Sequence, residues 1–305
     1  MPAYNAQAFI GEAIISIINQ SFPWWELIVV NDGSTDETQK IVAEHMEQDA
    51  RIRLIAQNQV GSALARQAGF LEAQGDYIYF LDADDRSCPQ TLERLHAALL
   101  DWPETVAAYG LVVEVDAKGQ ILAKQGPLIR DRTPKDLFAR LIERGFLSIG
   151  SVCVRRCFLS AEDFVTSLTI GEDWLFWCRL AAKGPFIFIG SDPRVLEIRK
   201  HTTNKTGIPW ATLVAGWLTA NATIFADGVT MQKLSPNRQA IHRQTGKFYI
   251  YFDAIKRSWA RREYGSMCLY MVKAFCTLLA SPRAARHIIY HFRAEILILL
   301  RVQSQ

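Results

Sequence analysis

The chain has 305 residues and a formal net charge of +3; half of its residues are hydrophobic and 21% are charged. This composition is ordinary for a globular protein and excludes a chain without a packed core, and the length suits one large α/β domain or one domain with an appendage. The charge is unevenly distributed, because residues 231–305 hold 13 Lys and Arg against 3 Asp and Glu, whereas the first 230 hold 21 against 28. An acidic N-terminal part and a basic C-terminal part predict that the two parts bind different partners.

The cysteines and the N-terminus limit the cellular setting. Six cysteines never form a CxxC pair, which argues against a zinc site and for free thiols in a reducing, cytoplasmic compartment. The chain begins with a loop pattern, so we expect no signal peptide. The longest nearly apolar run, residues 266–281, contains Lys273 and is short for a membrane span.

Strands and helices alternate through the first hundred residues. The apolar run 26–30 is typical of a parallel strand buried on both faces, and Asp36 caps a helix to about residue 47. Further strands are expected at 51–56 and 77–81, and further helices at 62–74 and 89–100. This rhythm predicts a parallel sheet with helices on its faces.

The pattern then changes. Antiparallel strands are expected at 105–115 and 120–124, helices at 134–144 and 172–183, and strands at 151–154, 186–189 and 195–199. From residue 210 onward the chain reads as helical. We therefore predict a catalytic domain over residues 1–208 and a basic helical region over residues 209–305.

The segment Pro2-Ala-Tyr-Asn5 has the composition of a loop at the carboxyl end of a strand, where ligands bind in open α/β sheets. Only Met1 precedes it. We therefore expect the first strand of the sheet to be missing, which would leave the neighbouring strand without a hydrogen-bonding partner. We also expect the natural reading frame to begin upstream.

Three carboxylates directly follow the apolar strand at 77–81. Asp82, Asp84 and Asp85 repel one another unless a cation is present, and their oxygens suit Mg²⁺ or Mn²⁺ with substrate phosphates. A solvated loop that caps the helix after Pro89 is an equally good interpretation of this segment alone.

Two further polar positions lie in the expected crevice. Asp32 and Gly33 form a turn in which a carboxylate and backbone amides face the ligand side, or they form a turn and nothing more. Arg66 lies one turn inside the helix that follows Gly61, where a guanidinium can meet a diphosphate. A surface arginine is the alternative.

Together, PAYN (2–5), WELIVVNDGSTDET (25–38), GSALARQAG (61–69) and FLDADD (80–85) resemble the family 2 glycosyltransferases. The resemblance covers residues 1 to about 205. It implies an α/β GT-A fold with a mostly parallel sheet, and an enzyme that moves one sugar from a nucleotide-sugar to a saccharide or lipid-linked glycan with inversion. It also implies a divalent cation, Mn²⁺ or Mg²⁺, as cofactor.

The resemblance implies a role for each matching residue. Tyr4 stacks on the nucleobase, Asp32 accepts a hydrogen bond from a uracil imide, and Arg66 supports the base and diphosphate region. A UDP-sugar is therefore favoured, although dTDP presents the same imide edge and GDP fits less well. The implied nucleotide-contacting residues are Pro2, Ala3, Tyr4, Asn5, Asp32, Arg66, Asp82, Asp84 and Asp85; the implied metal ligands are Asp84, Asp82 and His201.

The transfer also needs a base for the acceptor hydroxyl. Glu172 and Asp173 open a helix whose dipole favours their ionised forms, and Asp173 matches the residue that supplies the base in the resembled family. An acidic pair that only stabilises its helix is the alternative. No QxxRW motif follows, so a polymer-making enzyme is not expected. His201 and Arg199 lie in a segment that resembles the family's loop over the donor.

The basic tail has no motif with chemistry. A basic cluster, residues 256–262, precedes the apolar run 267–279, and this pattern suits peripheral association with an anionic membrane surface at the cytoplasmic face, or a packed appendage. His287 and His291 share a helix face, and we expect both to face solvent. Nucleic acid is not expected as a partner, because the aromatic residues lie within apolar runs.

Two other functions stay open. A sugar-nucleotide pyrophosphorylase needs a Gly-rich basic loop after its first strand, and PAYN offers none. A non-catalytic nucleotide- or glycan-binding relative would bind donor without turnover. The transferred sugar, the acceptor and the oligomeric state are not encoded in recognisable motifs.

Overall fold

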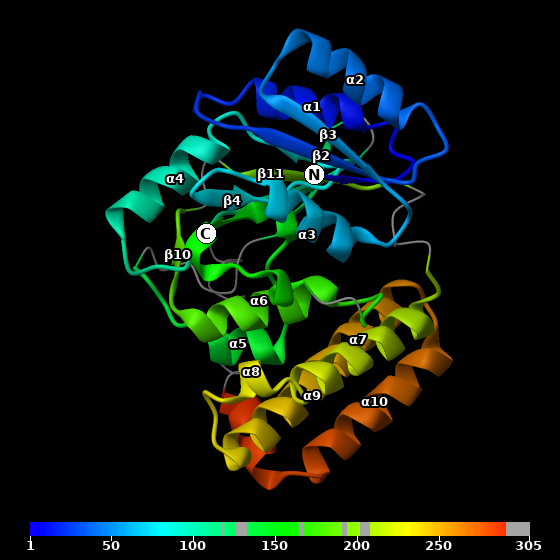
Figure 1. The fold of residues 1–305 in the computed structure, drawn as a ribbon. Helices are drawn as coiled ribbons and strands as arrows, with labels where there is room; N and C mark the ends of the chain where they lie inside the picture. The colour runs from blue at the N-terminus through cyan, green and yellow to red at the C-terminus, as the bar shows by residue number, and fades with distance from the viewer. Residues whose placement is uncertain (117–118, 126–132, 165–166, 191–193, 202–207, 291–305) are drawn as a thin grey trace, which may run out of the picture. The chain divides into compact units, whose positions relative to one another are not determined.

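The computed structural model describes residues 1–116, 119–125, 133–164, 167–190, 194–201 and 208–290 (Figure 1). The chain divides into two compact units. The first comprises residues 1–137, 146–167 and 172–207. The second comprises residues 138–145, 168–171 and 208–305, so two short segments before residue 208 belong with the helical tail.

The first unit begins with a parallel sheet in the order β1-β2-β3. Its strands and the helices around it are β1 (Pro2–Ala3), α1 (Ile10–Ile18), β2 (Leu27–Asp32), α2 (Thr38–Gln48), β3 (Ile52–Gln57) and α3 (Ser62–Glu72). Successive side chains of β2 point to opposite faces of the sheet, so helices cover both faces. Val29 packs in one core cluster with residues of α1 and α2, whereas Val30 packs with Ala65 of α3. Figure 1 shows α1 and α2 on one face of this sheet and α3 on the other. The predicted strand buried on both faces is confirmed.

The first position of this sheet is held by a short strand. Pro2 and Ala3 pair in parallel with Val30 and Asn31. The Met1 amino group donates to the carbonyl of Ile28 at 2.8 Å, and the Val30 amide donates to the Met1 carbonyl at 2.8 Å. The prediction that the first strand of the sheet is missing is therefore wrong, because Met1 and β1 supply hydrogen bonds to the edge of β2.

The remaining strands form two mixed sheets, in the orders β10-β6-β9-β4 and β5-β11-β7-β8. They are β4 (Tyr77–Tyr79), β5 (Arg86–Ser87), β6 (Ala107–Tyr109), β7 (Val112–Val115), β8 (Ile121–Gln125), β9 (Val152–Arg155), β10 (Phe186–Phe188) and β11 (Leu196–Arg199). β4, expected as a third parallel strand, pairs antiparallel with β9. The expected single strand 105–115 is two strands in different sheets, and it breaks at Gly110, where a Cβ would lie 2.4 Å from Val195 Cγ1.

Two helices complete the core of the first unit. α4 (Thr91–Asp101) packs Leu95 and Leu99 against the sheet that contains β6 and β9. α6 (Glu172–Lys183) has the predicted bounds, and its Trp177 is fully buried.

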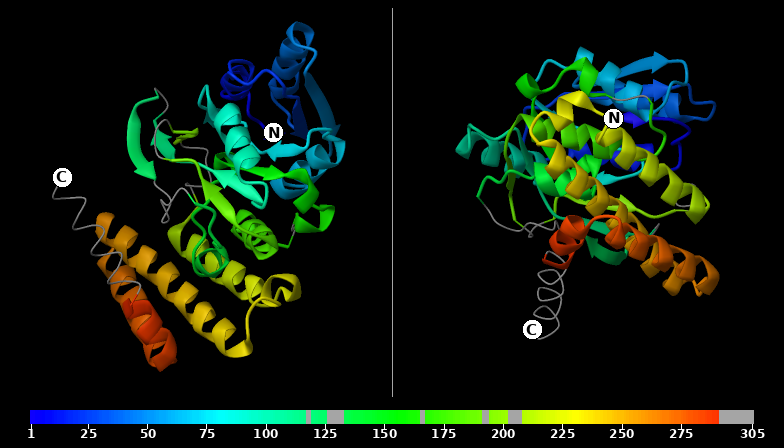
Figure 2. Two further views of the ribbon diagram at one scale, coloured as in Figure 1. Left: turned by 90° about the vertical axis from the view of Figure 1, so that its left-hand side faces the viewer. Right: turned by 90° about the horizontal axis from the view of Figure 1, so that it is seen from below.

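The second unit is helical, as predicted for the residues that the structure describes after 208. Its helices are α5 (Phe138–Glu143), α7 (Trp210–Ile224), α8 (Gly228–Met231), α9 (Pro236–Ala260), α10 (Tyr264–Leu279) and a last helix, Pro282–Tyr290. Figure 2 shows α9 and α10 side by side. Within the described residues, no single helix is long and apolar enough to cross a membrane; by length and composition alone, α10 and the last helix pass together as a pair bent by 112°.

Candidate active site

The N-terminal loop is tied to the loop that follows β2. Asn5 has a left-handed backbone conformation, with φ of 47°. Its amide donates to Ser34 Oγ at 3.0 Å, and its Oδ1 accepts from the Thr35 amide at 2.8 Å. Tyr4, which precedes it, is 46% exposed, so its ring is accessible at the carboxyl end of β1. Asn5 therefore positions the loop, while Tyr4 offers an aromatic surface.

Asp32 is buried and holds the loop that leads into α3. Its Oδ1 accepts from Gln57 Nε2 at 2.8 Å and from the Val60 amide at 2.9 Å, and its Oδ2 accepts from the Gly61 amide at 2.8 Å. The loop also needs a glycine at position 33, where φ is +77° and a Cβ would lie 2.9 Å from the Gln59 nitrogen. Both carboxylate oxygens of Asp32 thus have hydrogen-bond partners inside the protein.

Arg66 is a buried cation. Its side chain is 9% exposed, and its Nη2 donates to Asp82 Oδ1 at 2.7 Å. The alternative of a surface arginine is therefore wrong. Arg66 lies on α3 and Asp82 follows β4, sixteen residues later in the sequence, and the tertiary fold brings them into contact.

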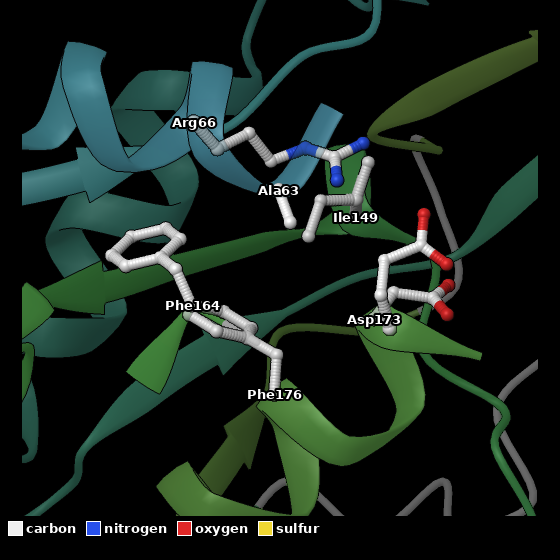
Figure 3. Close-up of a pocket in the computed structure, with 7 residues that line it drawn as sticks. Ala63, Arg66, Ile149, Phe164, Asp173 and Phe176 are labelled. Carbon is white, nitrogen blue, oxygen red and sulfur yellow. The ribbon is translucent and has the colours of Figure 1, made fainter. Parts of the chain in front are cut away.

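A small hollow joins Arg66 to the start of α6. It is lined by Ala63, Arg66, Ile149, Phe164, Glu172, Asp173 and Phe176. In Figure 3 Arg66 enters from α3 and Asp173 from the start of α6, while Phe164 and Phe176 lie away from the two charged groups. Ser62 Oγ, at the start of α3, donates to Glu172 Oε1 at 3.3 Å. The predicted Glu172–Asp173 pair thus lies beside the predicted Arg66.

Sequence reasoning missed two residues that line this hollow, Ile149 and Phe164, and one that contacts Glu172, Ser62. Ser62 lies within the GSALARQAG segment, next to the helix start, and that position was the signal that could have found it. Phe164 and Ile149 reach the hollow only through the tertiary fold, because they lie in segments without a motif.

The carboxylates after β4 form a crowded cluster. Asp84 Oδ2 lies 3.1 Å from His201 Nε2. Burial and the neighbouring Asp82 raise the pKa of Asp84. Asp85 is buried, and burial together with Asp82 and Asp84 raises its pKa well above the usual range. None of the three carboxylates caps α4, whose N-cap residue is Gln90 without a side-chain cap, so the capping interpretation is wrong.

His201 and Arg199 come to this cluster from β11 and the residues after it. The His201 ring stacks on Phe9, with 4.3 Å between the ring centroids. The Arg199 amide donates to Asp85 Oδ1 at 3.0 Å, and the Arg199 guanidinium bonds to Glu12 Oε2 at 2.6 Å. Arg199 is thus committed to Glu12 and to the backbone support of the cluster. The sequence did not predict the contributions of Phe9 and Glu12.

The donor atoms around Asp84 fit a divalent cation. The side chains of Asp82 and Asp84 are 33% and 32% exposed, so solvent reaches them, and His201 Nε2 points at Asp84. The carboxylate oxygens suit Mn²⁺ or Mg²⁺, and an imidazole nitrogen is a ligand for transition metals more than for Mg²⁺. Asp85 differs, because it is buried and bonded to the backbone of Arg199.

Curated relatives match the N-terminal part of the chain. An uncharacterized glycosyltransferase of Haemophilus influenzae is 42% identical over 95 residues, which are 31% of this chain and 38% of that protein. The putative teichuronic acid biosynthesis glycosyltransferase TuaG of Bacillus subtilis is 39% identical over 94 residues, 30% of this chain and 37% of that protein. The matched segment thus spans less than half the length of these relatives.

A solved structure shares the fold over most of the chain. The crystal structure of S. aureus TarS in complex with UDP-GlcNAc matches with a TM-score of 0.64 and 19% identity, over 90% of this chain and 79% of that chain. The family model for glycosyl transferase family 2 matches residues 1–159, more than half of the chain, and this range includes Asp32, Arg66 and the carboxylates after β4. Fold and sequence therefore agree that the chain belongs to glycosyl transferase family 2.

Proposed function

We propose that this chain is an inverting glycosyltransferase that moves one sugar from a UDP-sugar to a saccharide or lipid-linked glycan acceptor. One observation carries the proposal. Arg66 forms an ion pair with Asp82 of the carboxylate cluster and lines the same hollow as Asp173. A candidate diphosphate and metal site thus adjoins a candidate base.

The carboxylate cluster would hold Mn²⁺ or Mg²⁺ through Asp84, Asp82 and His201. Burial and the negative charge of Asp82 raise the pKa of Asp84, as expected where carboxylates are crowded together away from water. A bound divalent cation neutralises the leaving diphosphate. Asp85 acts as a positioning residue, because its bond to the Arg199 amide holds the strand that leads to His201.

The donor's uridine would lie along the loops at the carboxyl ends of β1 and β2. Tyr4 offers an exposed ring for stacking, and Asp32 fixes the loop backbone at Val60 and Gly61. Arg66 supplies fixed positive charge that can act on the diphosphate as well as on Asp82. The S. aureus TarS crystal structures with UDP-GlcNAc and with UDP support a uridine nucleotide.

Asp173 would take the proton of the acceptor hydroxyl. The pair Glu172–Asp173 lies in the first turn of α6, where the helix dipole favours carboxylates, and Ser62 holds Glu172. A base that activates the acceptor while the diphosphate leaves from the opposite side inverts the anomeric carbon in a single displacement.

The acceptor would be presented at a membrane, with the protein on its cytoplasmic face. α10 exposes a group of large apolar side chains, namely Leu269, Met271, Val272, Phe275 and Leu279. Arg261 and Arg262, just before α10, are also exposed. Exposed apolar side chains next to basic ones suit an anionic lipid surface.

Release of UDP from a panel of UDP-sugars tests this function. The wild-type chain, an Asp173→Asn variant and an Asp101→Asn control are incubated with each UDP-sugar, Mn²⁺ and glycolipid extract. We expect one UDP-sugar to release UDP with wild type and control, and Asp173→Asn to lose this turnover by at least about 100-fold. A folded wild-type chain that binds UDP without releasing it from any sugar would instead support a non-catalytic relative.

A further inference from the structure

The second unit holds a cluster of possible metal ligands that the proposed transfer does not use. Glu143 ends α5, His242 lies on α9, and His287 lies on the last helix. Glu143 Oε1 lies 2.7 Å from His242 Nδ1 and 2.7 Å from His287 Nε2. The three possible ligand atoms all lie within 4.8 Å of one another. Three helices therefore direct one ligand atom each toward a common point.

The cluster is buried on one side and open on the other. Glu143 is 2% exposed and His242 is 9% exposed, whereas the His287 side chain is 26% exposed. The expectation that His287 faces solvent is wrong, because its imidazole reaches Glu143 and meets the His242 ring edge to face at 5.3 Å. His291, expected on the same face, lies outside the described residues.

The packing around the cluster is built for close approach. Gly246 follows His242 by one helical turn, and a Cβ there would lie 2.4 Å from Asn221 Nδ2 and 3.2 Å from the Glu143 carbonyl oxygen. Asn221 is fully buried, and its amide nitrogen and oxygen form no hydrogen bond among the described residues. The interior beside the Glu143 backbone is thus polar, and its hydrogen-bonding groups are incompletely satisfied among the described residues.

We propose that Glu143, His242 and His287 bind a zinc ion, with water entering on the His287 side as the fourth ligand. Imidazole nitrogen and carboxylate oxygen are common zinc ligands, and tetrahedral sites with two histidines, one glutamate and a water are among those that proteins form. Ligand bonds of about 2.0–2.1 Å place tetrahedral ligand atoms about 3.3 Å apart. The present 2.7 Å separations would therefore open by about 0.6 Å, which small side-chain rotations provide.

The absence of CxxC pairs argued against a zinc site with cysteine ligands. It does not bear on a site made of one glutamate and two histidines. Glu143 is 99 residues from His242 and 144 from His287, so no local spacing could reveal it. On binding, the zinc ion replaces the hydrogen bonds between the carboxylate and the rings, and each neutral imidazole carries its proton on the ring nitrogen that does not bind zinc. The ion would tie α5, α9 and the last helix together and stabilise the second unit by mass action.

Zinc titration of the full chain tests the proposal. An Asp84→Ala background removes the proposed donor-site metal, so that any remaining site is separate from it. In this background we expect one equivalent of Zn²⁺ to bind and to raise the melting temperature. Adding His287→Ala removes a direct ligand and should weaken zinc binding by more than about 100-fold. Loss of a residue that only contacts a ligand weakens metal binding by roughly 10–100-fold. Adding His45→Ala, a histidine of the first unit, should leave it unchanged.

Cobalt(II) absorption keeps the test decisive if His287→Ala fails to fold. Co²⁺ in the Asp84→Ala chain should give visible bands of a low-coordinate nitrogen and oxygen site, which Zn²⁺ then displaces. Two results would overturn the proposal: no such bands in the folded chain, or zinc binding that His287→Ala leaves unaltered. The cluster would then be a hydrogen-bonded pair of histidines on a buried carboxylate and nothing more.

Discussion

Replacing Asp32 with asparagine tests how the loop before α3 is held. The aspartate accepts three hydrogen bonds, and each hydrogen bond to a charged group contributes about 1.5–3 kcal/mol. Asparagine keeps an oxygen for Gln57 and Val60 but presents its NH₂ group to the Gly61 amide, so one bond is lost and two lose their charge. Gly61 is exposed and water can reach its amide, which reduces the cost. We expect Asp32→Asn to lower the free energy of unfolding by about 2–3 kcal/mol.

Urea denaturation of the wild type and of Asp32→Asn measures this change. Glu37→Gln is a matched control, because its carboxylate is exposed and pairs only with Lys40 among the described residues; it should cost less than about 0.5 kcal/mol. An Asp32→Asn variant as stable as this control would refute the view that Asp32 holds the loop. If that variant nevertheless lost UDP binding, Asp32 would be a direct ligand of the base.

Three further predictions follow from the same geometry. Asp173→Asn should keep UDP affinity within about twofold of wild type by calorimetry while transfer is lost, since a base is not a donor-binding group; a large loss of affinity would argue against the assigned role. Burial and the neighbouring Asp82 and Asp84 raise the pKa of Asp85. Above the usual carboxyl pKa, the metal-free folded protein therefore still binds a proton that the unfolded chain has released. The free energy of unfolding should then fall as pH rises from the usual carboxyl pKa through the raised one. Asp85→Asn should remove most of that slope in urea denaturation between about pH 4 and pH 8, and an unchanged slope would contradict the assignment. Phe275→Glu, on the exposed face of α10, should reduce sedimentation with anionic vesicles but leave UDP binding intact, and unchanged sedimentation would count against the membrane surface.

Local patterns predicted the elements that carry the site. The apolar run of β2, the start of α3 after Gly61 and the bounds of α6 all follow from periodicity and helix-start signals, and the structure confirms them. The crowding of the carboxylates after β4 was also visible, because three acids in four positions cannot separate. Whether these residues act as assigned stays a prediction.

The predictions that were wrong concern features that depend on contacts between residues far apart in the sequence. Nothing near Gly110 indicates that Val195 will approach closely enough to break the strand 105–115. The pairing of β4 with β9 joins segments about 75 residues apart, so local alternation could not reveal its antiparallel direction. His287 looked like a surface histidine because its partner, Glu143, lies on another helix.

Metal-dependent nucleotide binding tests the central claim most directly. Calorimetry of UDP with the wild type, Asp84→Ala and Asp101→Ala, with and without Mn²⁺, separates the proposed site from the rest of the acidic surface. We predict that wild type and Asp101→Ala bind UDP more tightly with Mn²⁺, and that Asp84→Ala loses this dependence. Mn²⁺-dependent UDP binding that a folded Asp84→Ala variant retains in full would contradict the assignment of the carboxylate cluster as the donor site.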